Sequence, residues 1–320
     1  MTVAVASYQR RTALLRLLDG LADQLRREPD LGDGLDVVVV LDGSTDGSRE
    51  ALSELVLPVP LRVVWQPNRG LAAARNAGWR ASGAELVWFL DDDLVPADGL
   101  VRRHRAGHSD QPRTVVGPCV VPTGARTTAG TREWWQLRYE EMAAGGITRF
   151  DQFSAANTSL PRAVLEQLGG FDERFTGYGR EDYELGLRLL DAGIEVVLDP
   201  EAVAQHEQER TEAEGCRLRR QEGRNVVRFA AMHPGRSAEV LRAPEPPRLL
   251  VRVCRAGRAL LPLLRAVVAV LVALVAAAER RGRRRVLLRI TGSLCFALGV
   301  LEEDRGGTAT AALMWRLTRP

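Results

Sequence analysis

The sequence predicts an α/β protein in which helices flank a mostly parallel central sheet, followed by a separate C-terminal helical region. Short runs rich in β-branched residues alternate with helical segments over residues 2–121, an order typical of strand–helix–strand units with right-handed crossovers. The run DVVVVL at 36–41 is apolar almost throughout, as in strands that are buried on both faces of a parallel sheet. A proline-rich stretch at 242–248 then precedes a basic, apolar tail.

Local patterning defines the individual elements. Short apolar runs rich in valine predict strands, and apolar residues that recur every three or four positions predict helices. In the first part of the chain the expected strands are 2–6, 36–41, 61–65 and 85–90, and the expected helices are 12–25, 46–55 and 71–81. Further on we expect helices at 132–142, 162–168 and 180–192, and a strand at 195–198. Parallel strands present their carboxyl ends at one edge of the sheet, where ligands bind in such folds.

The stretch 242–248 is the expected linker between an α/β domain over residues 1–241 and a helical tail over residues 249–320. The tail contains two apolar segments, 259–278 and 286–301, joined by an arginine-rich connector. If both segments crossed a membrane, the connector would have to be translocated, against the tendency of arginines to stay on the inner side. We therefore expect the tail helices to pack on the rest of the protein, to form a homodimer, or to lie on an anionic membrane surface.

Composition and charge exclude several classes of protein. The chain has 320 residues, of which 45% are hydrophobic and 27% charged, and it is too apolar to be disordered. All 44 basic residues are arginines, and a net charge of only +3 argues against a nucleic-acid partner. The charge is uneven, because residues 248–289 contain 11 arginines and one acid. The four cysteines form no CxxC pair and the first residues lack a secretory signal, so we expect a cytoplasmic protein that meets the inner face of the membrane through 248–289.

Three consecutive acids, Asp91, Asp92 and Asp93, follow the strand expected at 85–90. Like charges at a strand end repel one another, and the arrangement is costly unless cations or hydroxyl groups compensate. Hard oxygen ligands at this density suit Mg²⁺ or Mn²⁺ bridging a diphosphate. His206, which follows a strand and a short polar turn, could complete such a metal site. The alternatives are an acidic surface turn and a structural histidine.

An inward-pointing carboxylate is expected near the start of the helix that follows the glycine-rich loop. Asp182 lies on the same helical face as Leu185 and Leu189, and those leucines should face the core. A carboxylate is favoured near a helix N-terminus, and one that points inward beside a mobile loop is suited to act as a general base. The alternative is a helix-capping acid without chemistry. Glu184 and Arg188, four residues apart, are expected to form an ordinary surface pair.

Taken in order, several segments resemble the motifs of a family 2 glycosyltransferase of GT-A fold. The matching segments are 7–10 (SYQR), 41–46 (LDGSTD), 68–78 (NRGLAAARNAG), 91–93 (DDD), 169–173 (GGFDE) and 179–182 (GRED). The loop from 169 to 182 also resembles the corresponding stretch of galactosyltransferases. The resemblance covers about residues 2–210 and implies a GT-A fold, Rossmann-like with a mostly parallel sheet.

The resemblance implies a role for each matching residue. The residues that it places at the nucleotide are Ser7, Asp42, Arg75, Asp91 and Asp92, with Asp42 at the base and Asp91 at the ribose or the metal. The ligands that it implies for Mn²⁺ or Mg²⁺ are Asp91, Asp93 and His206. Asp182 would be the catalytic base, and Glu181 would contact the acceptor.

The activity that the resemblance implies is inverting, metal-dependent transfer of a sugar from a nucleotide-sugar, first of all a UDP-sugar, to an acceptor hydroxyl. The nucleotide-sugar half would be about 1–121 and the acceptor half about 122–241. In the acceptor half, Trp134 and Trp135 are candidates for stacking on a sugar of the acceptor, with a role as core anchors as the alternative. The acceptor stays open among glycans, lipid-linked sugars and small molecules.

Two departures from the family pattern bear on nucleotide choice, and two other functions compete. Leu41 replaces the first acid of the usual Asp-Asp pair, and Gln9 replaces the usual Asn. A sugar-phosphate nucleotidyltransferase has a similar fold but would carry a glycine-rich loop after the first strand, where this chain has SYQR. A non-catalytic GT-A-like protein that docks on membranes or partners is the second alternative, and the intact Asp91, Asp93 and Asp182 argue against it.

Overall fold

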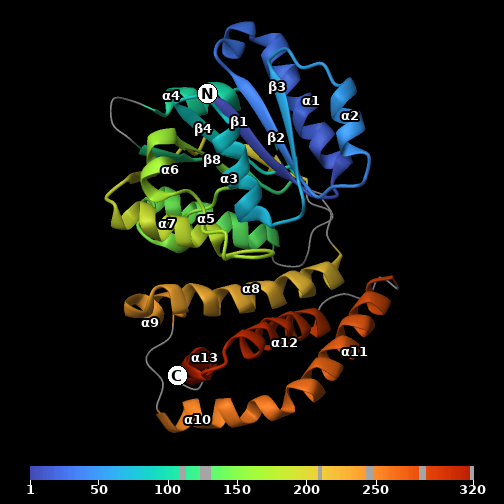
Figure 1. The fold of residues 1–320 in the computed structure, drawn as a ribbon, viewed down its shortest axis with the longest axis vertical. Helices are drawn as coiled ribbons and strands as arrows, with labels where there is room; N and C mark the ends of the chain where they lie inside the picture. Colours follow the sequence, from blue (N-terminus) through green and yellow to red (C-terminus); the bar gives the residue numbers. More distant parts are fainter. Residues whose placement is uncertain (109–112, 123–130, 208–210, 243–247, 281–285, 318–320) are drawn as a thin grey trace. The chain divides into compact units, whose positions relative to one another are not determined.

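A seven-stranded sheet forms the centre of the first part of the chain (Figure 1). The computed structural model describes residues 1–108, 113–122, 131–207, 211–242, 248–280 and 286–317. In their order across the sheet the strands are β3 (Leu61–Gln66), β2 (Asp36–Asp42), β1 (Thr2–Ser7), β4 (Leu86–Leu90), β8 (Asn157–Pro161), β6 (Arg113–Val116) and β9 (Glu195–Leu198). The first four run parallel, β8 is antiparallel to both of its neighbours, and β9 is parallel to β6. The predicted mostly parallel sheet is confirmed.

The helices of this unit cover both faces of the sheet. They are α1 (Arg11–Arg27), α2 (Ser48–Glu54), α3 (Leu71–Ala81), α4 (Leu100–Ala106), α5 (Thr131–Gly145), α6 (Arg162–Leu168) and α7 (Glu181–Asp191), with short 3₁₀ turns at Pro29–Gly32 and Phe150–Gln152. Alternate residues of β2 face opposite ways: Val37 and Val39 pack with the leucines of α1, whereas Val38 and Val40 pack with alanines of α3. Burial on both faces explains why the DVVVVL run is apolar almost throughout.

A second, three-stranded sheet brings a distant segment to the carboxyl end of β4. Its strands are β5 (Leu94–Pro96), β10 (Ala204–His206) and β7 (Cys119–Val120), with β10 in the middle. The β10 strand runs antiparallel to β5, so that His206 lies opposite Leu94, and the next N–H, that of Glu207, donates to the carbonyl of Asp93 at 3.0 Å. This pairing explains why His206 reaches the acidic segment.

The remaining helices belong to a second compact unit. The first unit consists of Met1–Thr176 and Glu181–Glu209, and the second of Gly177–Arg180 and Arg210–Pro320. The helices of the second unit are α8 (Glu212–Met232), α9 (Ser237–Val240), α10 (Arg248–Gly257), α11 (Leu261–Arg280), α12 (Val286–Glu303) and α13 (Thr308–Leu317), with 3₁₀ turns at Pro234–Arg236 and Arg258–Leu260. The sequence suggested a boundary at 242–248, of which residues 243–247 lie outside the described residues. The contacts within each unit instead place α8 together with the tail helices, because α8 packs along α12.

The contact between α8 and α12 depends on glycines and on one buried carboxylate. A Cβ atom on Gly299 of α12 would collide with the carbonyl oxygen of Arg220 on α8, so the two backbones approach closely there. Glu302 accepts hydrogen bonds from Arg220, Arg224 and Arg265. Burial disfavours the charge of Glu302, but these three guanidinium groups outweigh it and lower its pKa to about 2. The helices are therefore joined by packing and by an ionised cluster.

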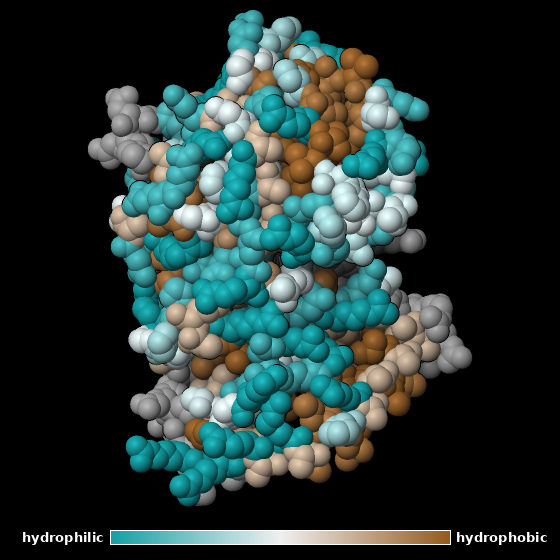
Figure 2. Space-filling model, in the orientation of Figure 1, coloured by the Kyte–Doolittle hydropathy of each residue, from teal (hydrophilic) through white to brown (hydrophobic). Residues whose placement is uncertain are grey.

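One helical stretch in the described part of the tail is long and apolar enough to cross a membrane, judged by length and composition alone. It runs from Cys254 to Ala277, 24 residues with a mean hydropathy of 2.6. Figure 2 shows hydrophobic side chains gathered along α11, at the lower right of the view. The sequence pattern favoured packed or surface-lying helices, and α11 does pack on α12 through one of its faces.

We predict that Gly299→Ala destabilises the second unit, whereas Gly292→Ala in the same helix does not. The new methyl group of Gly299→Ala meets the α8 backbone, which costs about 1–3 kcal/mol. At Gly292 nothing lies within 4 Å of the added atom, and replacing a helical glycine by alanine stabilises by up to about 1 kcal/mol. Thermal unfolding and amide exchange in α8 and α12 compare the two variants. Equal stability of both would contradict the close crossing.

Candidate active site

The acids that follow β4 are compensated by a hydroxyl group and a guanidinium group, as a charge cluster of this density requires. Asp92 is buried; its Oδ2 accepts a hydrogen bond from Ser7 Oγ at 2.7 Å and its Oδ1 one from Arg10 Nη1 at 3.2 Å. Burial raises the pKa of Asp92 to about 7, against the opposing charge of Arg10. Asp92 and Ser7, both predicted to bind the nucleotide, thus tie the carboxyl ends of β1 and β4 together.

A buried arginine joins the strand-end acids to helix α7. Arg75 of α3 is 4% exposed; its Nη2 donates to Asp91 Oδ1 at 2.8 Å and its Nη1 donates to Glu181 Oε1 at 2.9 Å. Burial and the neighbouring charge of Asp182 together raise the pKa of Glu181 to about 7, while Arg75 opposes both. Residues 91 and 181, far apart in sequence, are therefore held on either side of one guanidinium group.

Asp93 and His206 have the spacing of two ligands of one metal ion. Nε2 of His206 lies 3.4 Å from Oδ1 of Asp93, and both side chains are buried. Two ligand atoms each about 2.1 Å from an ion, at a right angle or slightly more, lie roughly 3.0–3.4 Å apart. The other oxygen of Asp93 accepts a hydrogen bond from Arg10 Nη1 at 2.6 Å. The donor set of one carboxylate and one imidazole fits Mn²⁺ or Mg²⁺.

The predicted triad of ligands is not preassembled. Within the described ranges, no group of three or more His, Cys, Asp and Glu side chains is arranged to hold an ion. Asp91 is drawn to Arg75 rather than to the pair formed by Asp93 and His206. An ion at this pair would take its remaining ligands from phosphate oxygens and water, as Mg²⁺ commonly does in phosphate-binding sites.

Asp182 lies in the first turn of α7, half-buried, and its Oδ1 accepts a hydrogen bond from the N–H of Tyr183 at 2.8 Å. Leu185 and Leu189 are fully buried, so the predicted core face of the helix is confirmed. Of the two adjacent acids, however, Glu181 is the more deeply buried. Glu181, which was predicted to contact the acceptor, is paired with Arg75 of the protein itself, whereas Asp182 is partly exposed.

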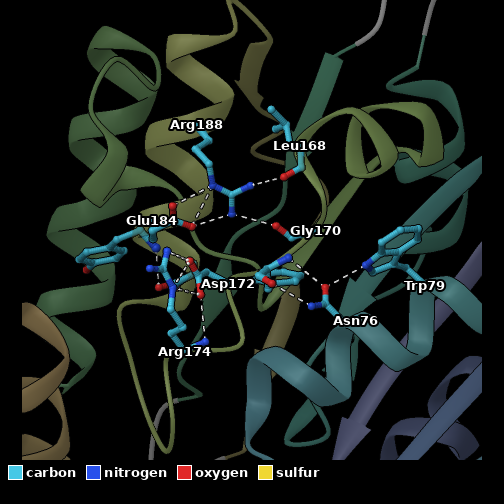
Figure 3. A network of polar contacts seen from close by, with 11 residues as sticks. Asn76, Trp79, Leu168, Gly170, Asp172, Arg174, Glu184 and Arg188 are labelled. Carbon is cyan, nitrogen blue, oxygen red and sulfur yellow. Dashed lines mark hydrogen bonds and ion pairs between the residues drawn. The ribbon is translucent and has the colours of Figure 1, made fainter. Parts of the chain in front are cut away.

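An asparagine of α3 clamps the glycine-rich loop (Figure 3). Oδ1 of Asn76 accepts hydrogen bonds from the N–H of Phe171 and from Trp79 Nε1, and its Nδ2 donates to the Phe171 carbonyl and to Glu173. All four amide bonding positions are thereby used. Gly170 has a φ of +74°, and a Cβ atom there would lie 2.7 Å from Trp79 Nε1. Only glycine allows this approach.

The pair Glu184 and Arg188 was expected on the surface, and that prediction is wrong. Glu184 is buried, and Arg188 binds it through Nε and Nη2 at 2.8 and 2.6 Å. The same guanidinium group donates to the carbonyl oxygens of Leu168 and Gly170 at 2.7 and 2.8 Å (Figure 3). The pair therefore fixes the start of the loop to α7. Spacing of four residues could not show this role, because the loop carbonyls come from another segment.

Asp42 holds a neighbouring loop. Its Oδ1 accepts hydrogen bonds from Gln66 Nε2 and the N–H of Arg69, at 2.7 and 2.9 Å, and its Oδ2 one from the N–H of Gly70 at 2.8 Å. The preceding Leu41, which stands in place of an acid, is fully buried and packs with α1. At this position the chain therefore has an apolar core residue where the family pattern has an acid.

The other departure has a local explanation. Gln9 adopts a φ of +55°, a conformation that Asn tolerates better than Gln. Its side chain compensates through two hydrogen bonds with Thr45, at 3.0 and 3.2 Å. The side chains of Trp134 and Trp135, which were candidates for sugar stacking, lie outside the described residues. Sequence reasoning also assigned no role to Arg10, although its position in the SYQR segment beside an acidic cluster was a usable signal.

Comparison with known families decides what this arrangement belongs to. Residues 2–169 match the model of glycosyl transferase family 2. The chain belongs to glycosyl transferase family 2. Residues 135–212 match the model of the N-terminal domain of galactosyltransferase, which confirms the likeness inferred from the glycine-rich loop.

Relatives and solved structures agree with this assignment. A validoxylamine A glucosyltransferase of Streptomyces hygroscopicus subsp. limoneus is 32% identical over 231 residues, or 63% of this chain and 50% of the relative. A pre-mycofactocin glycosyltransferase of Mycobacterium tuberculosis is 26% identical over 226 residues, 69% and 47% of the two chains. This chain thus spans about half the length of these relatives.

The fold itself recurs in a solved mannosyltransferase. PcManGT from Pyrobaculum calidifontis, in complex with GDP-Man and Mn²⁺, superposes with a TM-score of 0.56 at 18% identity, covering 95% of this chain and 86% of that one. This likeness confirms the predicted GT-A fold.

We predict that Glu181→Gln changes how stability depends on pH. The pKa of Glu181 is about 7 in the folded protein and 4.5 as the ordinary value, so its contribution is present below about pH 4.5 and is lost as pH rises through about 7. The glutamine variant lacks this loss. Its urea midpoint relative to the natural chain should therefore rise between about pH 4.5 and 7 and then level off. A difference that does not vary with pH would contradict the burial of Glu181.

Proposed function

We propose that this chain is an inverting glycosyltransferase that moves a sugar from a nucleoside diphosphate sugar to an acceptor hydroxyl with the help of a divalent cation. The observation that carries the proposal is the Arg75 bridge, which holds Asp91 and Glu181 on either side of one buried guanidinium group. Donor-side acids and the first turn of α7 are thereby fixed next to each other. Family membership supports sugar transfer, and the GDP-Man and Mn²⁺ bound to the solved mannosyltransferase support the class of donor and the ion.

In this proposal Asp182 is the catalytic base. Its carboxylate accepts the proton of the acceptor hydroxyl, and the hydroxyl oxygen attacks the anomeric carbon from the side opposite the diphosphate. As the new carbon–oxygen bond forms, the bond from that carbon to the diphosphate oxygen breaks, and the configuration inverts. The half-exposed position of Asp182 leaves it accessible to the acceptor, while Glu181 positions the helix turn through Arg75.

The cation would be held by Asp93 and His206, with Asp91 near the ribose or the ion. When bound, it supplies positive charge that stabilises the leaving diphosphate. Arg10, which binds both Asp92 and Asp93, is a second source of positive charge at the same edge of the sheet. A UDP-sugar is the first donor to test, and GDP-mannose is the second because of the structural neighbour.

We predict that Asp182→Asn abolishes transfer while the fold is retained. Removing a general base costs about 10²- to 10⁴-fold in rate. The measurement is release of nucleotide from UDP-sugars and GDP-mannose in the presence of Mn²⁺, with water in place of the unidentified acceptor. The matched control is Asp191→Asn at the exposed, opposite end of the same helix, for which turnover should stay within about twofold. Equal turnover of Asp182→Asn and the natural chain would remove Asp182 from the mechanism.

We predict that Asp93→Asn weakens metal binding, whereas Asp92→Asn, at a residue that supports the fold, changes metal binding little. Loss of a direct ligand should raise the Mn²⁺ concentration for half-maximal binding of nucleotide by more than about tenfold. Asp92 has a pKa of about 7 and is held by Ser7, so an amide there replaces a carboxyl group that is already readily protonated and should shift the Mn²⁺ requirement by less than about threefold. Calorimetric titration of UDP at several Mn²⁺ concentrations measures both. The opposite order would assign the ion to Asp92.

A further inference from the structure

Helix α11 has two apolar faces, and among the described residues only one of them is covered by protein. Val268 and Val275 are buried, and Val268 packs with Cys295 and Leu298 of α12. The other face, together with the last residue of the preceding 3₁₀ turn, carries an exposed stripe whose members follow one another at intervals of three and four residues: Leu260 of the turn and Leu263, Val267, Val270 and Leu274 of α11. These side chains are 45–65% exposed, and a continuous apolar stripe on a surface marks a docking site. We call this set the outer stripe.

Polar contacts fix the orientation of α11 and thereby keep the outer stripe exposed. Arg258 donates to the carbonyl oxygens of Leu301 and Asp304, and Arg265 Nε donates to Glu302 Oε1 at 2.8 Å. Both arginines are thus anchored to the end of α12 and cannot rotate outward with the helix. These contacts therefore hold α11 in one orientation, with the outer stripe on its exposed face.

Arginines flank the outer stripe at both ends in the sequence. Before it, Arg248 and Arg252 of α10 are exposed. After it, residues 280–285 contain five arginines, and the only acid within residues 248–289 is Glu279. An apolar stripe between two basic segments complements a surface that has acyl chains beneath anionic headgroups.

The same intervals of three and four residues also occur in coiled coils, so a second copy of this chain is the main competing occupant. Charge argues against it. Arginines flank both ends of the stripe in the sequence, so parallel and antiparallel pairing alike would bring like charges together.

We propose that the outer stripe of α11 inserts into an anionic lipid leaflet, while the exposed Arg248 and Arg252 of α10 contact its headgroups. Because the opposite face of the helix is occupied by α12, α11 lies along the leaflet rather than crossing it alone. The second unit then serves as a membrane anchor. This proposal is independent of the proposed function, since no part of the candidate active site takes part in it.

The experiment uses the full chain and sedimentation with vesicles of phosphatidylcholine, with and without about 30% phosphatidylglycerol. The natural chain should bind the anionic vesicles, more weakly as salt is raised. The double variant Leu263→Gln, Val270→Gln should bind them at least about tenfold more weakly. The matched control for Val270→Gln is Val56→Gln, because Val56 is an exposed valine in the other unit, and its binding should be unchanged. All variants should keep their thermal midpoint within about 2 °C.

Three results would overturn the proposal. Equal binding of the natural chain and the double variant would mean that arginines alone attract the vesicles. No binding by the natural chain would show that the outer stripe does not insert into an anionic leaflet. A dimer in light scattering that the double variant dissociates would assign the stripe to self-association.

Discussion

The site depends on one buried guanidinium group. Arg75 is out of water, and a charge in that position is tolerated only with close partners of opposite sign. Its partners are Asp91, one residue past β4, and Glu181, the first residue of α7. Both acids belong to a cluster of like charges, and Arg75 supplies the positive charge between them. The planar, bidentate geometry of arginine lets one side chain hold two carboxylates from different segments in fixed positions.

Helix α3 supports this bridge with its next residue. Asn76 follows Arg75 and uses all of its amide bonding positions on Trp79 and on the loop that leads to α7. The loop is held from its other side by Arg188. The donor-side acids and the candidate base are therefore aligned by the rigid α3 helix, and the loop adds little freedom between them. Burial is the main cause of the raised pKa values of Asp92 and Glu181, and neighbouring carboxylates add to it against the opposing charges of Arg10 and Arg75.

How much of this arrangement the sequence predicted depends on how far apart in the chain the interacting residues lie. The DVVVVL strand, the strand that ends just before the three acids and the core face of α7 follow from local patterns, and the structure confirms all three. Two partners that complete the site are distant in the chain: Glu181 lies 106 residues from Arg75, and Phe171 lies 95 residues from Asn76. No local pattern encodes these two contacts. His206 reaches Asp93 only because β10 pairs with β5. Glu184 and Arg188 satisfied the spacing rule for a surface pair, yet tertiary packing buried the glutamate.

In the proposed function, the carboxyl end of β4 binds a divalent cation together with a nucleoside diphosphate, next to the base on α7. Anomalous diffraction from a crystal soaked with Mn²⁺ and UDP tests this binding most directly. We expect one manganese peak within about 2.3 Å of Asp93 and His206, adjacent to the diphosphate, with Arg75 still joined to Glu181. A nucleotide bound elsewhere, or manganese that avoids Asp93 while the nucleotide is present, would contradict it.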